Sequence, residues 1–571
     1  MRRLLFLSAV LAACVRPSHP KPPPSVLLVT IDTLRADRVG AYGDGAARTP
    51  RLDGLAREGV LFEKAFSPAP LTLPAHATIL TGLLPPQHGV RGNGTFAVGR
   101  EPRTLAEALR ERGLRTAAFV GAFPVARRFG LDRGFDVYDD AFTRASGLHF
   151  DFAERSADRV VDAARAWLAA TSGAVFVWAH LYDPHAPYAP PAGFREGDPY
   201  RGEIAFADAQ LGRLLEAWSA RVGPSVVAVT SDHGEAFGER GEESHGLFVY
   251  DTTLRVPLLL RGPGVPAGLR VAEAVSLADL PATLTQLAGA AGLPGRSAAR
   301  WWQKSDAGIS KEPLYAESLA PRLDFGWSDL RAWRSGRYKY VRAPHAELYD
   351  LEDDPAEGRN LAADRPELAA QLERELQAAL ARMGEAESRL TADAGSAERL
   401  RSLGYVQGPG GQGSGADPKD RIDVARRIAR ATGPFRDPED VVTVYREIAL
   451  LDPQNPLVNL RLADALLRAG QPADAIPVFR KVVAGGPRSA DPFVGLATAC
   501  AQLGRLDESE TALEQALEVD PSSGQAQFNL GEIARTRRDV ARARARFEAA
   551  LRDPVTRERA QARLAELGTA P

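Results

Sequence analysis

Short apolar runs alternate with amphipathic stretches over the first part of the chain. Five runs are rich in β-branched residues and end in polar ones: SVLLVTID (25–32), RTAAFVGA (115–122), AVFVWAHL (174–181), SVVAVTSD (225–232) and VPLLLRG (256–262). Intervening stretches such as residues 200–223 repeat their apolar residues with helical spacing. Buried strands alternating with helices predict an α/β domain, in which helices cover both faces of a mainly parallel sheet.

Two later segments predict a smaller antiparallel element beside that sheet. GRYKYVRAP (336–344) and ELYDLEDDP (347–355) are short strand-like runs with little sequence between them. Antiparallel strands can be joined by tight turns, whereas parallel strands need long crossovers. We therefore expect this element to close the α/β domain at its C-terminal side.

The C-terminal part of the chain repeats with a period of 34 residues. Large apolar residues recur at this interval, as do prolines near the end of each unit: Tyr445, Phe479, Leu513 and Phe547, with Pro453, Pro487 and Pro521. This period resembles the tetratricopeptide repeat, whose helix pairs stack into a curved array with a concave binding face. The resemblance implies an all-α array with a protein or peptide partner or self-association; an ordinary helical bundle is the alternative.

The 34-residue spacing sets where each repeat begins and ends, and it leaves a segment before the first repeat. Two repeats are clear, 456–489 and 490–523, a weaker third begins at 524, and a partial one precedes 456. The Gly-rich VQGPGGQGSGADP (406–418) is typical of a linker. We therefore expect a hydrolase-like domain over 25–385, a linker over 386–435 and the repeat domain over 436–571.

The N-terminus reads as an export signal. MRRLLFLSAVLAAC combines two arginines, a short apolar run and small residues before a cysteine. Residues 11–14 resemble a bacterial lipobox, which implies a lipoprotein signal peptide over 1–13, lipidation of Cys14 and a Pro-rich tether over 14–24. The expected product is secreted across the inner membrane and anchored to a membrane as a periplasmic or cell-surface lipoprotein. A plain cleaved signal is the alternative.

Composition narrows the possible partners and cofactors. The net charge of −2 gives no general argument for binding nucleic acid, so none is expected. The two cysteines, Cys14 and Cys500, exclude a disulfide framework and a cysteine-based zinc site. Oligomeric state is not indicated by any pattern.

Polar residues that can bind a metal follow two of the predicted strands. Asp32 comes after SVLLVTI, and Asp232 and His233 come after SVVAVT. If both runs are strands of one parallel sheet, the three side chains emerge at the same edge, where ligands gather. Two carboxylates and an imidazole suit Mn²⁺, Zn²⁺ or Mg²⁺. As an alternative, Asp32 is a helix cap and Asp232 belongs to a turn.

Several motifs in this order resemble the sulfatase branch of the alkaline phosphatase superfamily. They are SVLLVTIDTLRADRVGAYG, TPRLDGLAREGVLFEKAFS, PLTLPAHATILTG, HLYDPHAPY, VVAVTSDHGE and ELYDLEDDPAEGRNLA, and they cover about residues 25 to 385. The resemblance implies an alkaline-phosphatase-like fold and an enzyme that hydrolyses sulfuric or phosphoric esters, with a small molecule or a polymer as substrate.

Carried over residue by residue, the resemblance implies the metal ligands Asp32, Thr72, Asp232 and His233. Thr33 stands where many sulfatases have a second aspartate, and His233 stands where Ca²⁺-dependent members often have asparagine. One carboxylate fewer and an imidazole in place of an amide shift the preference away from Ca²⁺. One divalent ion is therefore expected from Mn²⁺, Zn²⁺, Mg²⁺ or Ca²⁺, with Mn²⁺ or Zn²⁺ preferred.

The implied catalytic residues are Thr72, His76, His185 and His245. Thr72 occupies the nucleophile position, but threonine cannot become formylglycine, and His76 replaces the arginine of the modification motif. A threonine alkoxide on a metal is a reasonable nucleophile for phosphorus. The histidines would orient the anion or shuttle a proton, or form structural hydrogen bonds; Arg35 and Arg91 would contact the anion or form structural ion pairs.

These features favour a metal-dependent hydrolase of phosphate, phosphonate or sulfate esters with a threonine nucleophile. Two alternatives remain open from sequence. One is a true sulfatase that uses threonine, and the other is a catalytically decayed scaffold protein that acts through its repeats.

Overall fold

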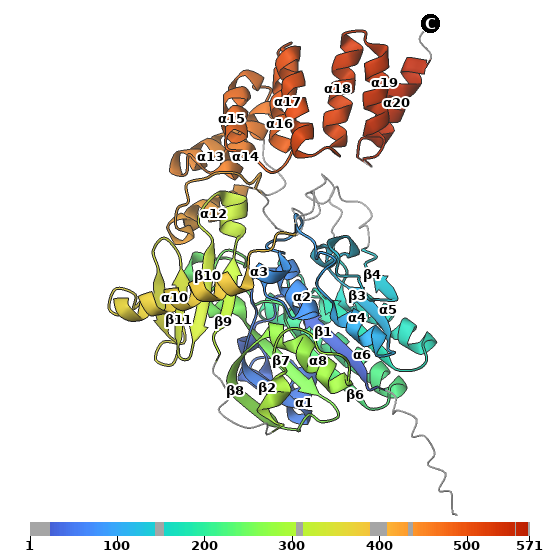
Figure 1. Ribbon diagram of the computed structural model, residues 1–571, viewed down its shortest axis with the longest axis vertical. Coiled ribbons are helices and arrows are strands. Elements are labelled where there is room, and N and C mark those ends of the chain that lie inside the picture. Colours follow the sequence, from blue (N-terminus) through green and yellow to red (C-terminus); the bar gives the residue numbers. More distant parts are fainter. Residues whose placement is uncertain are drawn as a thin grey trace, which may run out of the picture.

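The computed structural model describes residues 23–142, 154–303, 312–388, 408–431, 438–553 and 555–568. The predicted signal peptide, Cys14 and nearly all of the predicted tether lie outside these residues. Two bodies are visible in Figure 1: a sheet-containing domain, and a row of paired helices formed by the C-terminal part of the chain. Within the described residues, no helix has the length and apolar character needed to cross a membrane.

The first domain is built on an eight-stranded sheet in the order β4-β3-β5-β1-β6-β7-β2-β8. β7 runs antiparallel to both neighbours, and the other described pairings are parallel. The strands are β1 (Ser25–Ile31), β2 (Val60–Phe66), β3 (Arg115–Val120), β4 (Val137–Asp139), β5 (Val175–Leu181), β6 (Ser225–Thr230), β7 (Arg255–Arg261) and β8 (Leu269–Ser276). The predicted mainly parallel sheet is confirmed, with β2, β4 and β8 as additional strands.

Helices cover both faces of this sheet. One face packs against α2 (Thr72–Thr81), α4 (Leu105–Glu111) and α8 (Leu280–Ala288). The other face packs against α1 (Pro50–Glu58), α5 (Ala157–Ala170) and α6 (Pro199–Arg221). Every residue of β1 and β5 is buried, which explains why their sequences are continuously apolar. The short helices α3 (Pro85–His88), α7 (Asp251–Leu254) and α9 (Ala320–Phe325) lie in the connections.

The predicted antiparallel element is a four-stranded sheet in the order β12-β11-β10-β9. Its strands are β9 (Leu314–Ser318), β10 (Leu330–Ser335), β11 (Tyr338–Arg342) and β12 (Glu347–Asp350). One face packs against α10 (Pro366–Met383) through Leu372 and Leu376, which are fully or almost fully buried. The two runs that sequence identified are β11 and β12.

The C-terminal domain is the expected array of helix pairs. Its helices are α13 (Pro438–Leu451), α14 (Pro456–Arg468), α15 (Pro472–Ala484), α16 (Asp491–Gln502), α17 (Leu506–Val519), α18 (Gly524–Thr536), α19 (Val540–Ala550) and α20 (Arg557–Gly568). The Phe479 ring is fully buried against Gly495, where an added Cβ would lie 2.4 Å from a ring carbon. The Phe547 ring packs on Gly531 in the same way, so large and small residues of the repeat fit together.

The segment between the two domains packs against both of them. Residues 408–431, inside the predicted linker, include the helix α12 (Ile422–Ala431). The Arg426 guanidinium donates to the Gly241 carbonyl of the first domain at 2.8 Å, and the Gln412 N–H donates to the Gly485 carbonyl of the repeat array at 2.8 Å. Nearby, the Trp327 indole N–H donates to the Asp452 carboxylate at 2.7 Å, and both side chains are buried. The repeat array is therefore docked onto the hydrolase-like domain.

Candidate active site

Asp32 is placed at the carboxyl end of the central strand β1. Its backbone N–H donates to the Leu181 carbonyl at the end of β5, so the strand pairing carries on to this residue. The next residue, Thr33, has φ of 52°, a left-handed conformation that is costly for a β-branched side chain. Its hydroxyl donates to the Pro184 carbonyl at 2.8 Å. The backbone is therefore strained at Thr33, directly after the metal-ligand candidate Asp32.

Asp232 and His233 follow β6, the neighbour of β1. Oδ1 of Asp232 accepts from the His233 N–H at 3.0 Å and from the Thr33 N–H at 3.3 Å. Nδ1 of His233 lies 3.0 Å from the Gly234 carbonyl, which can only accept, so Nδ1 carries the hydrogen. These contacts direct the second carboxylate oxygen and Nε2 toward the same point as Asp32.

The three side chains form a fully buried cluster whose potential ligand atoms lie within 4.8 Å of one another. Among the described residues, both carboxylate oxygens of Asp32 and Oδ2 of Asp232 are buried without a hydrogen-bond partner. Burial, and then the charge of Asp232, raises the pKa of Asp32 well above its ordinary value. Burial opposes ionisation of Asp232 too, but the neighbouring His233, His76 and His180 together outweigh it and lower that pKa. Two carboxylates so placed fit a divalent cation.

Thr72 reaches the cluster from the first turn of α2. Its hydroxyl oxygen lies 3.4 Å from Nε2 of His233 and is fully buried. The preceding residue, Leu71, has extended backbone and no side-chain cap, so the helix begins at Thr72 itself. The first turn of a helix attracts anions, because its N–H groups lack partners within the helix. The predicted nucleophile is therefore at a place suited to an anionic ester.

His76 lies one turn further along α2, and both ring nitrogens make protein contacts. Nδ1 is 2.8 Å from the Thr72 carbonyl, and Nε2 is 3.1 Å from the Thr30 hydroxyl. Burial lowers the pKa of His76 to about 3. The contact with the Thr72 carbonyl lets His76 position the start of α2. Its predicted contact with the anion, or its predicted part in proton transfer, stays a prediction.

His185 and His245 form a second group of rings beside His233. The His245 ring centroid lies 4.4 Å from that of His233 and 5.1 Å from that of His185. Nδ1 of His245 is 3.0 Å from Glu235, a buried carboxylate that also accepts from the Tyr188 hydroxyl at 2.9 Å. His245 therefore has the orientation of a carboxylate-supported histidine.

Three comparisons relate this chain to known proteins. Residues 24–290 match the sulfatase family, and residues 436–490 and 466–527 match tetratricopeptide repeat families. An uncharacterized sulfatase of Escherichia coli, YidJ, is 25% identical over 60% of this chain and 83% of its own length. The N-terminal domain belongs to the sulfatase family. The fold class and the repeats expected from sequence are thereby confirmed.

Other relatives of the sulfatase domain differ in the ester that their names give. The Delta 4,5-hexuronate-2-O-sulfatase of Bacteroides thetaiotaomicron is 25% identical over 62% of this chain and 88% of its own length. The phosphonate monoester hydrolase of Agrobacterium radiobacter shares the fold with a TM-score of 0.54 at 22% identity, covering 63% of this chain and 96% of that chain. The family thus fixes a hydrolase of this class but not its ester.

The two arginines near the motifs of the sulfatase domain form structural ion pairs. Arg35 pairs with Asp37 at 2.8 Å and with Glu239 at 2.7 Å. Arg91 binds both carboxylate oxygens of Glu317, at 2.8 and 2.9 Å, where both side chains are buried. These contacts agree with the structural alternative for both residues.

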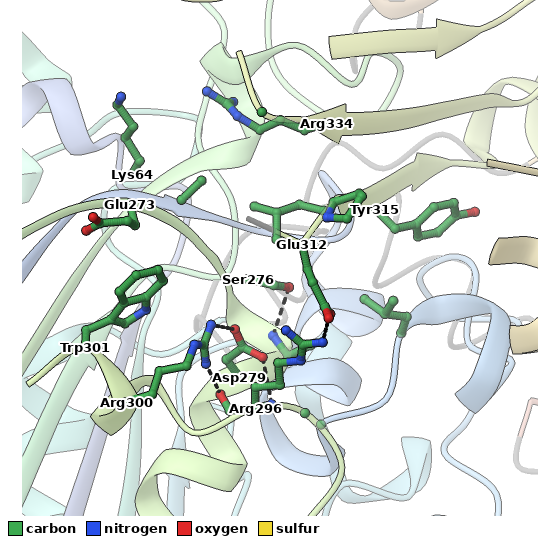
Figure 2. A pocket seen from close by; sticks show the side chains of 18 of the residues that line it. Lys64, Glu273, Ser276, Asp279, Arg296, Arg300, Trp301, Glu312, Tyr315 and Arg334 are labelled. Carbon is green, nitrogen blue, oxygen red and sulfur yellow. Dashed lines mark hydrogen bonds and ion pairs between the residues drawn. The ribbon is translucent and has the colours of Figure 1, made fainter. Parts of the chain in front are cut away.

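A separate cavity of about 460 Å³ lies between β8 and the small sheet of the sulfatase domain. Figure 2 shows Arg300 beside Asp279, and Arg296 beside Glu312. None of the predicted site residues lines it. Its arginines are paired with acids of the protein, so the cavity has no clear preference for an anion.

Sequence reasoning missed His180, Glu235 and Thr30. His180 is the next-to-last residue of β5 and lies beside Thr30 of β1, since the two are paired in the sheet register. Its Nε2 lies 3.3 Å from Oδ2 of Asp32. The same signal that identified Asp32, a polar residue at the end of a buried apolar run, is present in AVFVWAHL. Glu235 carries no such signal, because a carboxylate after a strand is common in turns.

Proposed function

We propose that the sulfatase domain hydrolyses phosphate or phosphonate esters, with Thr72 as nucleophile and without formylglycine. The observation that carries the proposal is the 3.4 Å contact between the Thr72 hydroxyl and Nε2 of His233, beside carboxylate oxygens of Asp32 and Asp232 that have no hydrogen-bond partner among the described residues. Catalysis through a covalent threonine ester needs a hydroxyl nucleophile in contact with a group of residues that can bind a cation.

Asp32, Asp232 and His233 would hold the cation, with Thr72 as its neighbour. A divalent cation bound there would lower the pKa of the hydroxyl and offset negative charge on the ester. Two carboxylates and an imidazole favour Mn²⁺ or Zn²⁺ over Ca²⁺, which takes six to eight oxygen ligands. This metal requirement is part of the proposal.

The first step transfers the acid group of the ester to Thr72. Oγ1 bonds to phosphorus, the bond between phosphorus and the leaving oxygen breaks, and the proton lost by the hydroxyl is, in net, the one that the leaving alcohol gains. His245, supported by Glu235 at 3.0 Å, is placed to give a proton to the leaving oxygen. His185, whose Nδ1 contacts the Ala186 carbonyl at 2.7 Å, lies in a T-shaped ring contact with His245.

The second step returns Thr72 to its starting state. Water attacks phosphorus in the Thr72 ester, the bond to Oγ1 breaks, and one proton of the water passes to Oγ1 while the remaining OH stays on phosphorus. A sulfate ester on threonine lacks the aldehyde route by which formylglycine hydrate expels sulfate, so it would have to be opened by water in the same way. This difference is our reason for placing phosphorus esters ahead of sulfate esters.

The test is a substrate panel with matched leaving groups. Nitrophenyl phosphate, a phosphodiester, a phosphonate monoester and nitrophenyl sulfate are assayed with the full chain, each with Mn²⁺, Zn²⁺ or Ca²⁺. We expect phosphorus esters to have the highest kcat/KM and Mn²⁺ or Zn²⁺ to support it. Preferred turnover of the sulfate would establish the alternative, a sulfatase with a threonine nucleophile. Absence of turnover on all four would favour a scaffold role for the repeat array.

We also propose that the chain is exported and lipidated at Cys14. The support is the lipobox-like sequence ending at this cysteine and the Pro-rich segment after it. Two or more acyl chains would anchor the domain firmly. When bacterial cells that express the protein are fractionated, the wild type should sediment with the membranes and Cys14→Ser should appear in the soluble fraction. Retention of the variant in the membrane fraction would contradict lipidation.

A further inference from the structure

The helix α12 lies where the repeat array meets the sulfatase domain (Figure 1). Its contact residues fall on two faces, each with a spacing of four residues. Val424 and Ile428 are buried and belong to the apolar cluster of the repeat helices. Ile422, Arg426 and Arg430 instead contact residues of the sulfatase domain. One short helix therefore contacts both domains through different side chains.

The segment of the sulfatase domain beside α12 is the loop 235–248, which carries both Glu235 and His245. The Ala236 N–H donates to the Ser244 carbonyl at 2.8 Å, so the two ends of the loop are paired. Each of these two residues is next in sequence to one member of the carboxylate–imidazole pair. The backbone bond therefore fixes the spacing between the carboxylate and the imidazole.

The tip of this loop, residues 241–243, contacts α12. The Arg426 guanidinium donates to the Gly241 carbonyl at 2.8 Å, and the Arg430 guanidinium donates to the Glu243 carboxylate at 3.1 Å. The backbone of Gly241 also lies close to the helix, because an added Cβ would be 3.1 Å from a nitrogen of Arg426 and from a side-chain carbon of Ile422. The helix thus holds the tip by a backbone contact and an ion pair.

A buried carboxylate joins the tip to the backbone around His245. Glu242 lies between the two residues that α12 contacts, and its side chain turns back into the loop. Its Oε1 accepts from the Leu247 N–H at 2.8 Å and from the Phe248 N–H at 3.2 Å. These N–H groups come two and three residues after His245. A displacement of the tip would therefore shift the backbone on both sides of the histidine.

We propose that Arg426 is a positioning residue for His245, and that α12 makes the leaving-group proton donor depend on the docked repeat array. This inference rests on the proposed function, because it concerns the group that would protonate the leaving oxygen. Arg426 does not touch the reacting atoms; it acts by holding the loop in which Glu235 supports His245. A movement of the repeat helices that shifts α12 would reach the site through the same loop.

The test compares leaving groups, because a misplaced proton donor slows the loss of a poor leaving group more than that of a good one. Two esters of the same acid group, one of nitrophenol and one of phenol, are assayed with the full chain and Mn²⁺. We expect Arg426→Ala to lower kcat at least about tenfold for the phenyl ester and less than about threefold for the nitrophenyl ester, with KM little changed.

Two further variants separate positioning from a general loss of structure. Arg426→Lys keeps a donor for the Gly241 carbonyl and should restore most of kcat for the phenyl ester. Arg427→Ala alters the next residue of the same helix, an exposed arginine, and should behave like the wild type.

Hydrogen exchange measures the loop without using activity. In mass spectrometry of the full chain, peptides that cover residues 236–248 should exchange faster in Arg426→Ala than in the wild type, while those that cover β1 should not change. Equal losses of kcat for both esters, or loop exchange equal to that of Arg427→Ala, would overturn the positioning role and leave the proposed function standing. No turnover of either ester by the wild type would overturn both.

Discussion

The hydroxyl oxygen of Thr72 lies 3.4 Å from Nε2 of His233, although 161 residues separate them in the chain. Thr72 begins α2, and His233 follows β6, so the contact joins one helix start to one strand end. Parallel strands deliver their C-terminal residues to one edge, where helix starts also gather. The chemistry proposed for the sulfatase domain depends on this meeting point.

Removing the Thr72 hydroxyl should abolish turnover. We expect Thr72→Ala to lower kcat/KM for the preferred ester by at least about 10³-fold, because the covalent route loses its nucleophile. Thr72→Ser keeps the hydroxyl and should retain a measurable part of the activity. Steady-state kinetics on the nitrophenyl panel measure both variants, and undiminished turnover by Thr72→Ala would remove threonine from the mechanism.

A buried charge cluster should govern the stability of the small sheet. The Lys339 ammonium lies 2.8 Å from Asp251 and 2.7 Å from Glu357, and all three side chains are largely buried. Lys339→Met would leave two buried carboxylates without their shared cation, at a cost of about 3–5 kcal/mol. Urea unfolding measures the loss. Arg359→Met, at an exposed ion pair with Asp364, is the control and should change stability little.

Stability should depend on pH through Asp183. Burial raises its pKa to about 7, against the hydrogen bond from the Ala157 N–H at 2.7 Å. The folded state therefore holds a proton that the unfolded state releases near pH 4. The stability contribution is complete below the unfolded pKa and is lost as pH rises through about 7, at up to about 1.4 kcal/mol per pH unit.

Asp183→Asn should remove this dependence. We expect the difference in unfolding free energy between variant and wild type to shift in favour of Asn as pH rises from 5 to 8. Chemical denaturation at several pH values gives that difference. A difference that stays constant across this range would show that Asp183 is ionised when folded.

The docking of the repeat array should make the two domains unfold together. Trp327 stacks on Phe325 with ring centroids 4.4 Å apart, and both belong to the apolar cluster of the repeat helices. Trp327→Ala should cost about 3–5 kcal/mol and split the calorimetric transition in two. Trp302→Ala, a half-buried tryptophan of the sulfatase domain, should leave one transition. A single transition in Trp327→Ala would show that the domains are coupled elsewhere.

The sequence predicted the strands that are apolar throughout and the helices that follow the 34-residue repeat. β1 and β5 are buried on both faces and read as continuous apolar runs, and the repeat period located α14 to α19. Strand direction is not encoded in apolar content, so the antiparallel course of β7 could not be predicted. β2 and β8 interrupt their apolar residues with charged ones and were missed.

The candidate site was predictable where a strand end or a family motif marked it. Asp32, Asp232, His233 and Thr72 come together as expected. The contact of His180 with Asp32 depends on the register between two strands that are 150 residues apart, which no local pattern records. The ring contacts of His76 likewise depend on Thr30, a residue with no chemical signal of its own.

The most direct measurement is intact mass spectrometry during turnover of a slow phosphonate monoester in the presence of Mn²⁺. The account predicts a covalent phosphonate adduct in the wild type, located by peptide mapping at Thr72 and absent from Thr72→Ala. Turnover that continues in Thr72→Ala without any adduct, or an adduct on another residue, would contradict it.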